Sequence, residues 1–101
     1  MKLASYRTGG RDSFGIVRED GIVDLGSRLP DVPDMMAAIA AGALTDGLFA
    51  DEASDLAHAD VEWTIPVPRP EKIWCIGVNY ADRNAEYKDG TAPPKYPSLF
   101  C

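Results

Sequence analysis

The stretch KIWCIGVNYADRNAEY, residues 72–87, changes character at its centre. Its first part, Lys72 to Val78, is an apolar, β-branched run without alternation, which is typical of a strand buried on both faces. After Gly77 the chain becomes polar and charged, and the pattern predicts a short helix over about residues 80–88 with Asn79 as its cap. A buried strand that ends at glycine and passes to polar side chains often places those side chains at a site.

The spacing within this expected helix groups several polar side chains. Asn79, Arg83 and Glu86 share one face, and Asp82 and Glu86 lie about one turn apart. A nearby guanidinium would keep both carboxylates ionised, and such carboxylates can act as a general base or contact a metal. The spacing alone favours the simpler alternative, a surface helix with an ion pair between residues three apart.

The composition and charge limit the classes of function that the protein can have. The chain has 101 residues, of which 46% are hydrophobic and 26% charged, as expected for one small globular domain. Its net charge of −6, without a basic cluster, argues against nucleic-acid binding. We expect no membrane segment, since no apolar run approaches the roughly 20 residues that span a bilayer. The first ten residues do not form a signal peptide.

Two cysteines make no disulfide framework, and Cys75, inside the apolar run, is expected to be a buried free thiol. These features predict a protein of the reducing cytoplasm.

The first 26 residues predict an antiparallel meander. The expected strands are Leu3 to Arg7, Ser13 to Arg18 and Ile22 to Leu25. Thr8-Gly9-Gly10 and Asp20-Gly21 supply the turns between them, and Gly26 closes the unit.

Two helices are expected next. Asp31 as the cap, Pro33 in the first turn and Gly42 as the stop delimit the first, whose methionines are expected in the core. Its apolar residues at helical spacing are Met35, Met36, Ile39 and Ala40. The second helix is expected over about residues 46–58, with an acidic solvated face rather than a metal site. That face carries Asp51, Glu52 and Asp55, and His58 near the helix end is expected to be structural.

The sequence after residue 60 indicates that the chain is divided into two domains. Val61, Trp63 and Ile65 alternate with polar residues, which predicts a half-buried strand. Prolines 66, 68 and 70 favour a stiff extended connection. We therefore expect an N-terminal α+β domain over residues 1–66, a proline-rich linker over 67–71, and an incomplete second domain over 72–101 that ends in a strand begun at Ser98. The sequence contains no zinc-ligand spacing, no phosphate-binding glycine pattern and no Ser-His-Asp set.

The pattern P-x-P-x-K-I-x-C-I-G-x-N-Y, residues 68–80, followed by a helix that carries an acid, resembles the start of the catalytic domain in the fumarylacetoacetate hydrolase family. Residues 1–66 look like the small N-terminal domain of many bacterial members, and Pro94 to Phe100 resemble the segment that begins the next strand. The resemblance therefore covers the whole chain. It implies an α+β fold in which the N-terminal strand-and-helix domain is followed by the beginning of a mixed β-roll.

The resemblance also implies a divalent metal, usually Mg²⁺ or alternatively Mn²⁺, that polarises the oxygens of a small 2-oxo or 1,3-dicarbonyl acid. Three acidic ligands hold this metal in the family, and they lie downstream of the segment that matches Cys101. No residue of this chain matches them, so no metal ligand is named. The family's reactions are C–C hydrolysis, decarboxylation, isomerisation and hydration, as in aromatic catabolism, and its members are commonly homodimers.

One departure bears on the reaction. In many members the short helix carries a His–Glu pair that activates water; Glu86 matches the glutamate, but Arg83 stands in place of the histidine. A guanidinium stays protonated up to about pH 12 and cannot relay a proton at neutral pH. Arg83 is therefore expected either to bind a substrate carboxylate, beside Asn79 and Tyr80, or to pair with Glu86. With Glu86 as the base, isomerase, hydratase, lyase or decarboxylase chemistry is favoured over hydrolysis.

Two functions stay open at this point. The first is a metal-dependent enzyme of this family acting on a small 2-oxo or dicarboxylic acid. The second is a non-catalytic N-terminal module that serves packing or assembly, because about 30 residues after the linker cannot build a core of their own. The chain ends inside an apolar element, so we expect it to be part of a longer polypeptide and to be inactive by itself.

Overall fold

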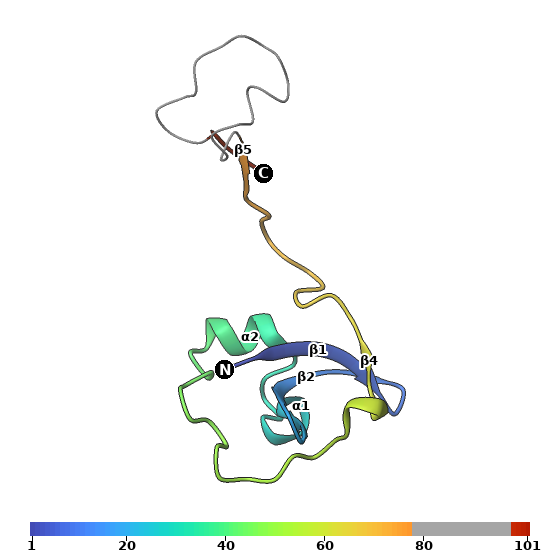
Figure 1. Cartoon of the computed structure of the whole chain (residues 1–101). Coiled ribbons are helices and arrows are strands. Elements are labelled where there is room, and N and C mark those ends of the chain that lie inside the picture. The colour runs from blue at the N-terminus through green and yellow to red at the C-terminus, as the bar shows by residue number, and fades with distance from the viewer. Residues whose placement is uncertain (78–97) are drawn as a thin grey trace. The chain divides into compact units, whose positions relative to one another are not determined.

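The computed structural model describes residues 1–77 and 98–101 (Figure 1). They fall into two compact units, Met1–Arg69 and Pro70–Cys101. The first contains β1 (Leu3–Thr8), β2 (Arg11–Arg18), β3 (Gly21–Asp24), α1 (Leu25–Arg28), α2 (Met35–Ala40), the 3-10 turn η1 (His58–Asp60) and β4 (Glu62–Trp63). The second contains β5 (Cys75–Gly77) and β6 (Ser98–Phe100). The first unit is thus a small α+β structure, while the assignment of residues 72–101 to a catalytic domain stays a prediction.

The first unit is built on an antiparallel sheet with the strand order β3-β2-β1-β4. The expected turn between β1 and β2 is confirmed: Gly9 and Gly10 have φ of 55° and 78°, and Thr8 pairs with Arg11. Positive φ at both central residues matches the right-handed twist of the flanking strands, and glycine adopts it without a steric cost.

The second hairpin differs by one residue from the prediction. Arg18 pairs with Gly21, so the turn is Glu19-Asp20 and Gly21 is the first residue of β3. The strand also ends earlier than expected, because Leu25 already belongs to α1, and so does Gly26.

The core lies between the sheet and α2. Its buried residues are Phe14, Ile16, Val23, Leu25, Met35 and Ala38. Within α2, Met35 is buried as expected and Met36 is partly buried, while Ile39 and Ala40 are exposed. A helix of six residues can turn only one side toward the sheet, so Met35 and Ala38 carry its contact with the core.

The start of α2 corrects the expected cap. Asp34, and not Asp31, is the cap, and its carboxylate accepts a 2.9 Å hydrogen bond from the amide of Ala37. A residue before proline avoids helical backbone angles, so Val32, which precedes Pro33, cannot join the helix. The expected end is confirmed, since Gly42 with φ 64° follows the C-cap Ala41.

The helix expected over residues 46–58 does not form. Gly47 and Phe49 have φ of 78° and 54°, and two left-handed residues interrupt an α-helical ladder. Leu48 and Phe49 still pack against the core, but from an irregular segment. His58 accordingly begins the 3-10 turn and does not end an α-helix.

The half-buried strand expected around Trp63 is also shorter and more exposed. Only Glu62 and Trp63 form β4, and both are exposed, as is Ile65. β4 is the last strand of the sheet beside β1, and the order of the strands leaves its outer edge open within the described part of the chain.

In the second unit, β5 and β6 pair antiparallel, with Cys75 opposite Phe100 and Gly77 opposite Ser98. The strand expected at Ser98 is confirmed. The expected burial of the preceding apolar run is wrong for residues 72–77, and Val78 lies outside the described residues. Trp74 is 62% exposed and Ile76 55%, because a two-stranded ribbon has no second layer to cover its faces. Cys75 is a free thiol as expected, although only partly buried. The helix expected over residues 80–88 lies outside the described residues.

Candidate functional site

The site predicted from the sequence lies outside the described residues. Asn79, Tyr80, Arg83 and Glu86 all fall in the range 78–97, so their proposed roles stay predictions. The described chain reaches Gly77 at the end of β5, two residues before Asn79. This supports the strand part of the strand-to-helix junction and leaves the helix part untested.

Within the first unit, the densest group of polar side chains surrounds Asp24 at the end of β3. The Asp24 side chain is 2% exposed. Its Oδ1 accepts hydrogen bonds from the hydroxyls of Tyr6 at 2.8 Å and Ser13 at 2.5 Å. Its Oδ2 accepts from Arg11 Nη2 and the Ser27 hydroxyl, both at 2.5 Å. We call these five residues the Asp24 cluster.

The register of the strands brings the cluster together. Tyr6 pairs with Ser13 across β1 and β2, and Gly15 pairs with Asp24 across β2 and β3. Directly opposite residues share a face of a sheet, and so do residues two apart on one strand, which places Tyr6, Ser13 and Asp24 on the same face. Gly15 lies between them, and a Cβ there would be 2.8 Å from the Tyr6 hydroxyl oxygen. The missing side chain lets the tyrosine reach across β2.

The hydrogen bonds of the cluster favour the ionised form of the Asp24 carboxylate. Burial by itself would raise the pKa of Asp24, but hydrogen bonds from Arg11, Ser13, Ser27 and Tyr6 outweigh it and lower the pKa to about 2. Burial, and then the hydrogen bond and the charge of Asp24, raise the pKa of Tyr6. At neutral pH Asp24 is therefore charged with its acceptor positions occupied, and Tyr6 is neutral. Because a general base needs a pKa near the working pH, this arrangement suits structure better than proton transfer.

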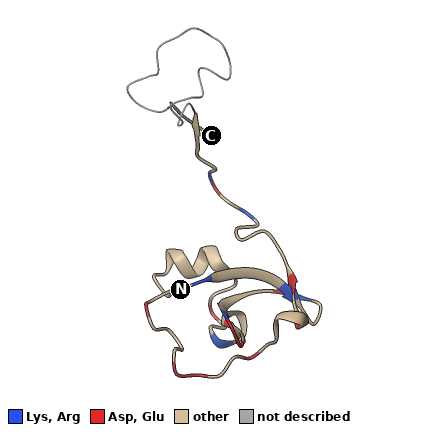
Figure 2. Cartoon of the chain, viewed as in Figure 1, with Lys and Arg blue, Asp and Glu red and all other residues tan. Residues whose placement is uncertain are grey.

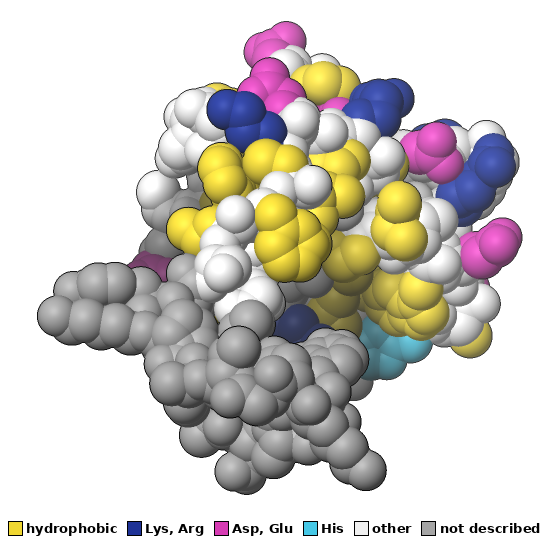
Figure 3. All heavy atoms as spheres, turned by 90° about the horizontal axis from the view of Figure 1, so that it is seen from above, with side chains coloured by type: hydrophobic (Ala, Val, Ile, Leu, Met, Phe, Trp, Pro, Cys, Tyr) yellow, Lys and Arg dark blue, Asp and Glu magenta, His cyan; other side chains and the backbone are white. Residues whose placement is uncertain are grey.

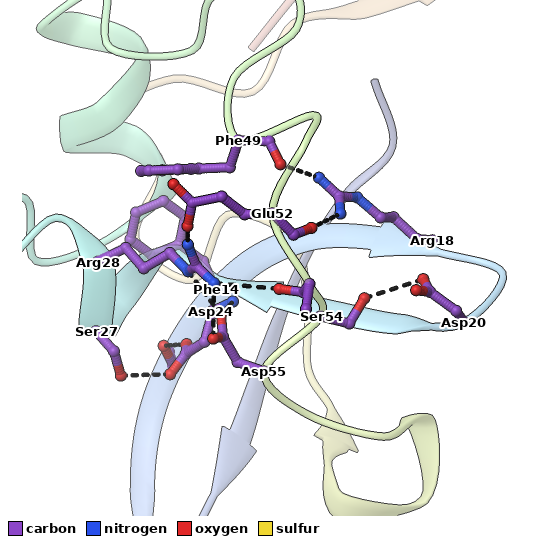
Figure 4. A network of polar contacts seen from close by, with 12 residues as sticks. Phe14, Arg18, Asp20, Asp24, Ser27, Arg28, Phe49, Glu52, Ser54 and Asp55 are labelled. Carbon is purple, nitrogen blue, oxygen red and sulfur yellow. Dashed lines mark hydrogen bonds and ion pairs between the residues drawn. The ribbon is translucent and has the colours of Figure 1, made fainter.

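A second polar group joins α1 to the segment after residue 48 (Figure 4). Arg28 Nε donates to Asp55 Oδ2 at 2.8 Å and Nη2 to Oδ1 at 2.9 Å, and Arg28 also forms an ion pair with Glu52. The hydrogen bonds from Arg28 lower the pKa of Asp55. The acidic run was expected to be solvated, and Asp51, Glu52 and Asp55 are indeed exposed, although Glu52 and Asp55 also pair with Arg28.

The described residues do not fit a divalent metal. Across residues 1–77 and 98–101, no three His, Cys, Asp or Glu side chains are grouped so that they could hold one. The carboxylates of Asp24 and Asp55 already accept hydrogen bonds from arginines. Figure 2 shows the positions of acidic and basic residues spread along the described ribbon.

Next to the sheet, a shallow hollow of about 450 Å³ is lined by Lys2, Ala4, Val17, His58 and Trp63. Figure 3 shows the single histidine beside apolar side chains on one face of the molecule. His58 Nε2 lies 2.7 Å from the carbonyl oxygen of Arg18, which is consistent with the expected structural role. The open, mostly apolar hollow does not bring catalytic groups together. In the part of the chain that the structure describes, no helix is long and apolar enough to cross a membrane.

Sequence reasoning missed the Asp24 cluster. Its residues are spread over β1, β2, β3 and α1, and they converge only once the strand register is known. The one signal was indirect: a glycine inside β2, at position 15, indicates a close approach from a neighbouring side chain.

Comparisons with known proteins relate the chain to one group of enzymes. No family model matches it. The mitochondrial oxaloacetate tautomerases FAHD2A and FAHD2B of Bos taurus are each 31% identical to it over 85 residues, or 79% of this chain and 26% of each relative. The mitochondrial oxaloacetate tautomerase fahd2 of Xenopus laevis is 29% identical over 99% of this chain and 34% of that relative. The chain thus spans about a quarter to a third of the length of the curated relatives it matches. The resemblance carried by residues 68–80 is confirmed, and the chain is a distant homologue of the oxaloacetate tautomerases of the fumarylacetoacetate hydrolase family.

Proposed function

We propose that this chain contributes to an isomerase of the fumarylacetoacetate hydrolase family that interconverts the keto and enol forms of a small 2-oxo dicarboxylic acid. The observation that carries the proposal is the likeness to oxaloacetate tautomerases over 79% to 99% of the chain. The sequence adds a second support. Arg83 stands where many members carry the histidine of a water-activating His–Glu pair, and a tautomerisation does not need an activated water.

The residues after β5 suit this chemistry. Keto–enol exchange moves one proton from the carbon beside the 2-oxo group to the oxo oxygen, with no net gain or loss of protons. Glu86 would take the proton from the carbon and deliver it to the oxo oxygen, with the reverse transfer in the opposite direction, a role worth about 10²- to 10⁴-fold in rate. Arg83 would hold a substrate carboxylate by two parallel hydrogen bonds, and Asn79 with Tyr80 would line the remaining polar end of the substrate.

The family relation also implies a divalent metal, Mg²⁺ or Mn²⁺, in full-length members. The described residues do not fit it and no residue of this chain matches the family's ligands, so we assign no metal ligand in this chain, and no step above runs through the metal. A homodimer and a location in the reducing cytoplasm are further parts of the proposal. The two described cysteines, Cys75 and Cys101, are both free, which supports a reducing compartment.

A second candidate function is a non-catalytic module for assembly. The observation that favours it is the apolar surface of the second unit, where large side chains on and beside the β5–β6 ribbon are more than half exposed. They are Ile73, Trp74, Ile76, Leu99 and Phe100. Such a surface needs cover, either from further strands of a longer polypeptide or from a partner. In the first unit, the saturated Asp24 cluster is in keeping with a structural role.

The deciding experiment is a tautomerase assay on the whole natural polypeptide that carries this sequence, because the 101 residues alone are expected to be inactive. The enol absorbance of freshly dissolved oxaloacetate is followed with and without Mg²⁺, for the natural chain, for Glu86→Gln, and for Asp82→Asn as the matched control one turn away. We expect Glu86→Gln to reduce the rate by about 10²- to 10⁴-fold and Asp82→Asn to leave it nearly unchanged. If the natural protein is active and Glu86→Gln keeps that activity, Glu86 has no catalytic role. A natural chain without activity favours the assembly module.

A further inference from the structure

Residues 49–56, here called the strap, run along the outer edge of β3. The amide of Ile22 donates to the carbonyl oxygen of Leu56 at 2.8 Å, and the amides of Asp55 and Leu56 donate back to the Ile22 carbonyl at 2.8 and 3.1 Å. The amide of Asp24 donates to Asp55 Oδ2 at 2.8 Å. Both β3 amides that point away from β2, at Ile22 and Asp24, are therefore satisfied by the strap, so it occupies the edge where another strand would pair.

The strap lies in direct contact with β3. A Cβ at Gly21 would be 2.5 Å from the Leu56 carbonyl oxygen and 2.9 Å from the Ser54 Cβ. Gly21 also has φ of 149°, which side chains rarely adopt. The Ser54 hydroxyl adds a 3.0 Å hydrogen bond to Asp20 in the preceding turn. A larger residue at position 21 would push the strap off the edge.

The strap is held from outside by two arginines, as Figure 4 shows. Arg18, at the end of β2, donates to the carbonyl oxygens of Phe49 at 2.5 Å and Glu52 at 2.6 Å. Hydrogen bonds from a charged donor are stronger than neutral ones, so one side chain fixes two points of the strap.

Arg28, in α1, provides the second attachment. Besides Asp55, it donates to the carbonyl oxygen of Ala53 at 3.1 Å. Its guanidinium carbon also lies 5.1 Å from the centre of the Phe49 ring, within range of a cation–π contact. Arg28 thus contacts the first residue of the strap, its middle and its end.

Apolar burial contributes less to this attachment than to the sheet, since Phe49 packs against the core but is only partly buried. The side chains of the strap are exposed or only partly buried, whereas the β1–β2 ladder carries the buried core residues Phe14 and Ile16. Segments with few buried apolar contacts open at a lower free energy than the core, and they often do so as one contiguous unit.

From these contacts we propose that the strap is a detachable edge guard. It opens as one unit when its arginine attachments fail, and it then exposes the edge of β3 to β3 of a second copy of this chain. An unpaired edge is a template for another strand, and two copies of the same edge can pair around a twofold axis. Ile22 and Asp24 would then exchange hydrogen bonds with their counterparts in place of the strap.

Residue-resolved amide exchange tests the opening, with the 101-residue chain, Arg28→Gln, and Arg7→Gln as a control that removes an ion pair elsewhere in the sheet, with Asp12. In Arg28→Gln we expect the amides of Ile22, Asp24, Asp55 and Leu56 to exchange faster by one common factor of about tenfold or more. The amides of the β1–β2 ladder should keep their rates. Unequal factors among the four amides, or an equal acceleration of the ladder, would contradict a unit opening.

Two further measurements keep the proposal testable. If Arg28→Gln does not fold, exchange of the natural chain in low urea replaces it: the four amides must share one opening free energy, below that of the ladder. Sedimentation then tests the guard role. Arg28→Gln should dimerise more strongly with concentration than Arg7→Gln, which has the same exposed β5–β6 ribbon. A monomeric Arg28→Gln with an open strap would overturn that role.

Discussion

The hydroxyl of Tyr6 on β1 donates a 2.8 Å hydrogen bond to Asp24 on β3, although the two strands are not neighbours in the sheet. The bond passes over β2 at Gly15, the residue that pairs with Asp24. It therefore ties three strands together at a point where the backbone hydrogen bonds link only adjacent ones. The first three predictions concern this bond and the residues that allow it.

Removing the Tyr6 hydroxyl leaves one acceptor position of a buried carboxylate empty. We expect Tyr6→Phe to lower the free energy of unfolding by about 1.5–3 kcal/mol, the usual range for a hydrogen bond to a charged group. Urea denaturation of both proteins measures the difference. The matched control is Thr8→Val, which removes the exposed hydrogen bond from Thr8 to the Asp60 carbonyl oxygen and should cost much less. Equal losses of unfolding free energy in the two variants would show that the Tyr6 bond contributes no more to stability than the exposed Thr8 bond.

The lowered pKa of Asp24 predicts a loss of stability in acid. Its pKa falls from an ordinary 3.8 to about 2 in the folded protein, so the unfolded chain binds the proton more readily. The contribution, about 2 kcal/mol, is present above pH 4 and is lost as the pH falls from about 4 to 2. Unfolding by urea at several pH values measures it.

Asp24→Asn provides the control for this pH dependence. The variant should be less stable at pH 6 and should lose less stability between pH 4 and 2 than the natural protein. Asp34 and Asp55 also have lowered pKa values, through the Ala37 amide and Arg28 respectively, so a smaller acid dependence remains. An unchanged slope in Asp24→Asn would contradict the assignment to Asp24.

A methyl group at position 15 should disturb the hydrogen bond from Tyr6 to Asp24. In Gly15→Ala the new Cβ would collide with the backbone carbonyl oxygen of Val23 and lie 2.8 Å from the Tyr6 hydroxyl oxygen, so both β3 and the tyrosine would have to shift. We expect a loss of about 1–3 kcal/mol, as for other overpacked positions. Gly9→Asn is the control, because its site is open and asparagine tolerates the φ of 55° there. Thermal unfolding that ranks the two variants equally would count against the steric argument.

A variant of Arg83 can show whether this residue acts in substrate binding or in proton transfer in the proposed reaction. Arg83→Gln removes the charge that would hold a substrate carboxylate, so KM for oxaloacetate should rise by about 10- to 100-fold while kcat changes less. Steady-state kinetics measure both constants, and Lys88→Gln, which removes a nearby positive charge, is the control. A fall in kcat with an unchanged KM would mean that Arg83 supports Glu86 instead of binding substrate.

The sequence by itself determined the features that depend on local chemistry. Gly9 and Gly10 accept positive φ, so the first hairpin could be predicted from its turn, and Gly42 marked the end of α2. The family relation was likewise readable in residues 68–80, because a motif is a property of neighbouring residues along the chain. The expected roles of Arg83 and Glu86 rest on that relation.

Only the tertiary structure decided what happens between residues 46 and 57. Their apolar spacing suits a helix, but Arg18 and Arg28 bind carbonyl oxygens that a helix would use internally, and β3 offers an edge that an extended segment can pair with. The Asp24 cluster could not be predicted from the sequence either. Strand register and the absence of a side chain at Gly15 bring its members together. Local propensity amounts to a few tenths of a kcal/mol per residue, and such contacts between distant segments outweigh it.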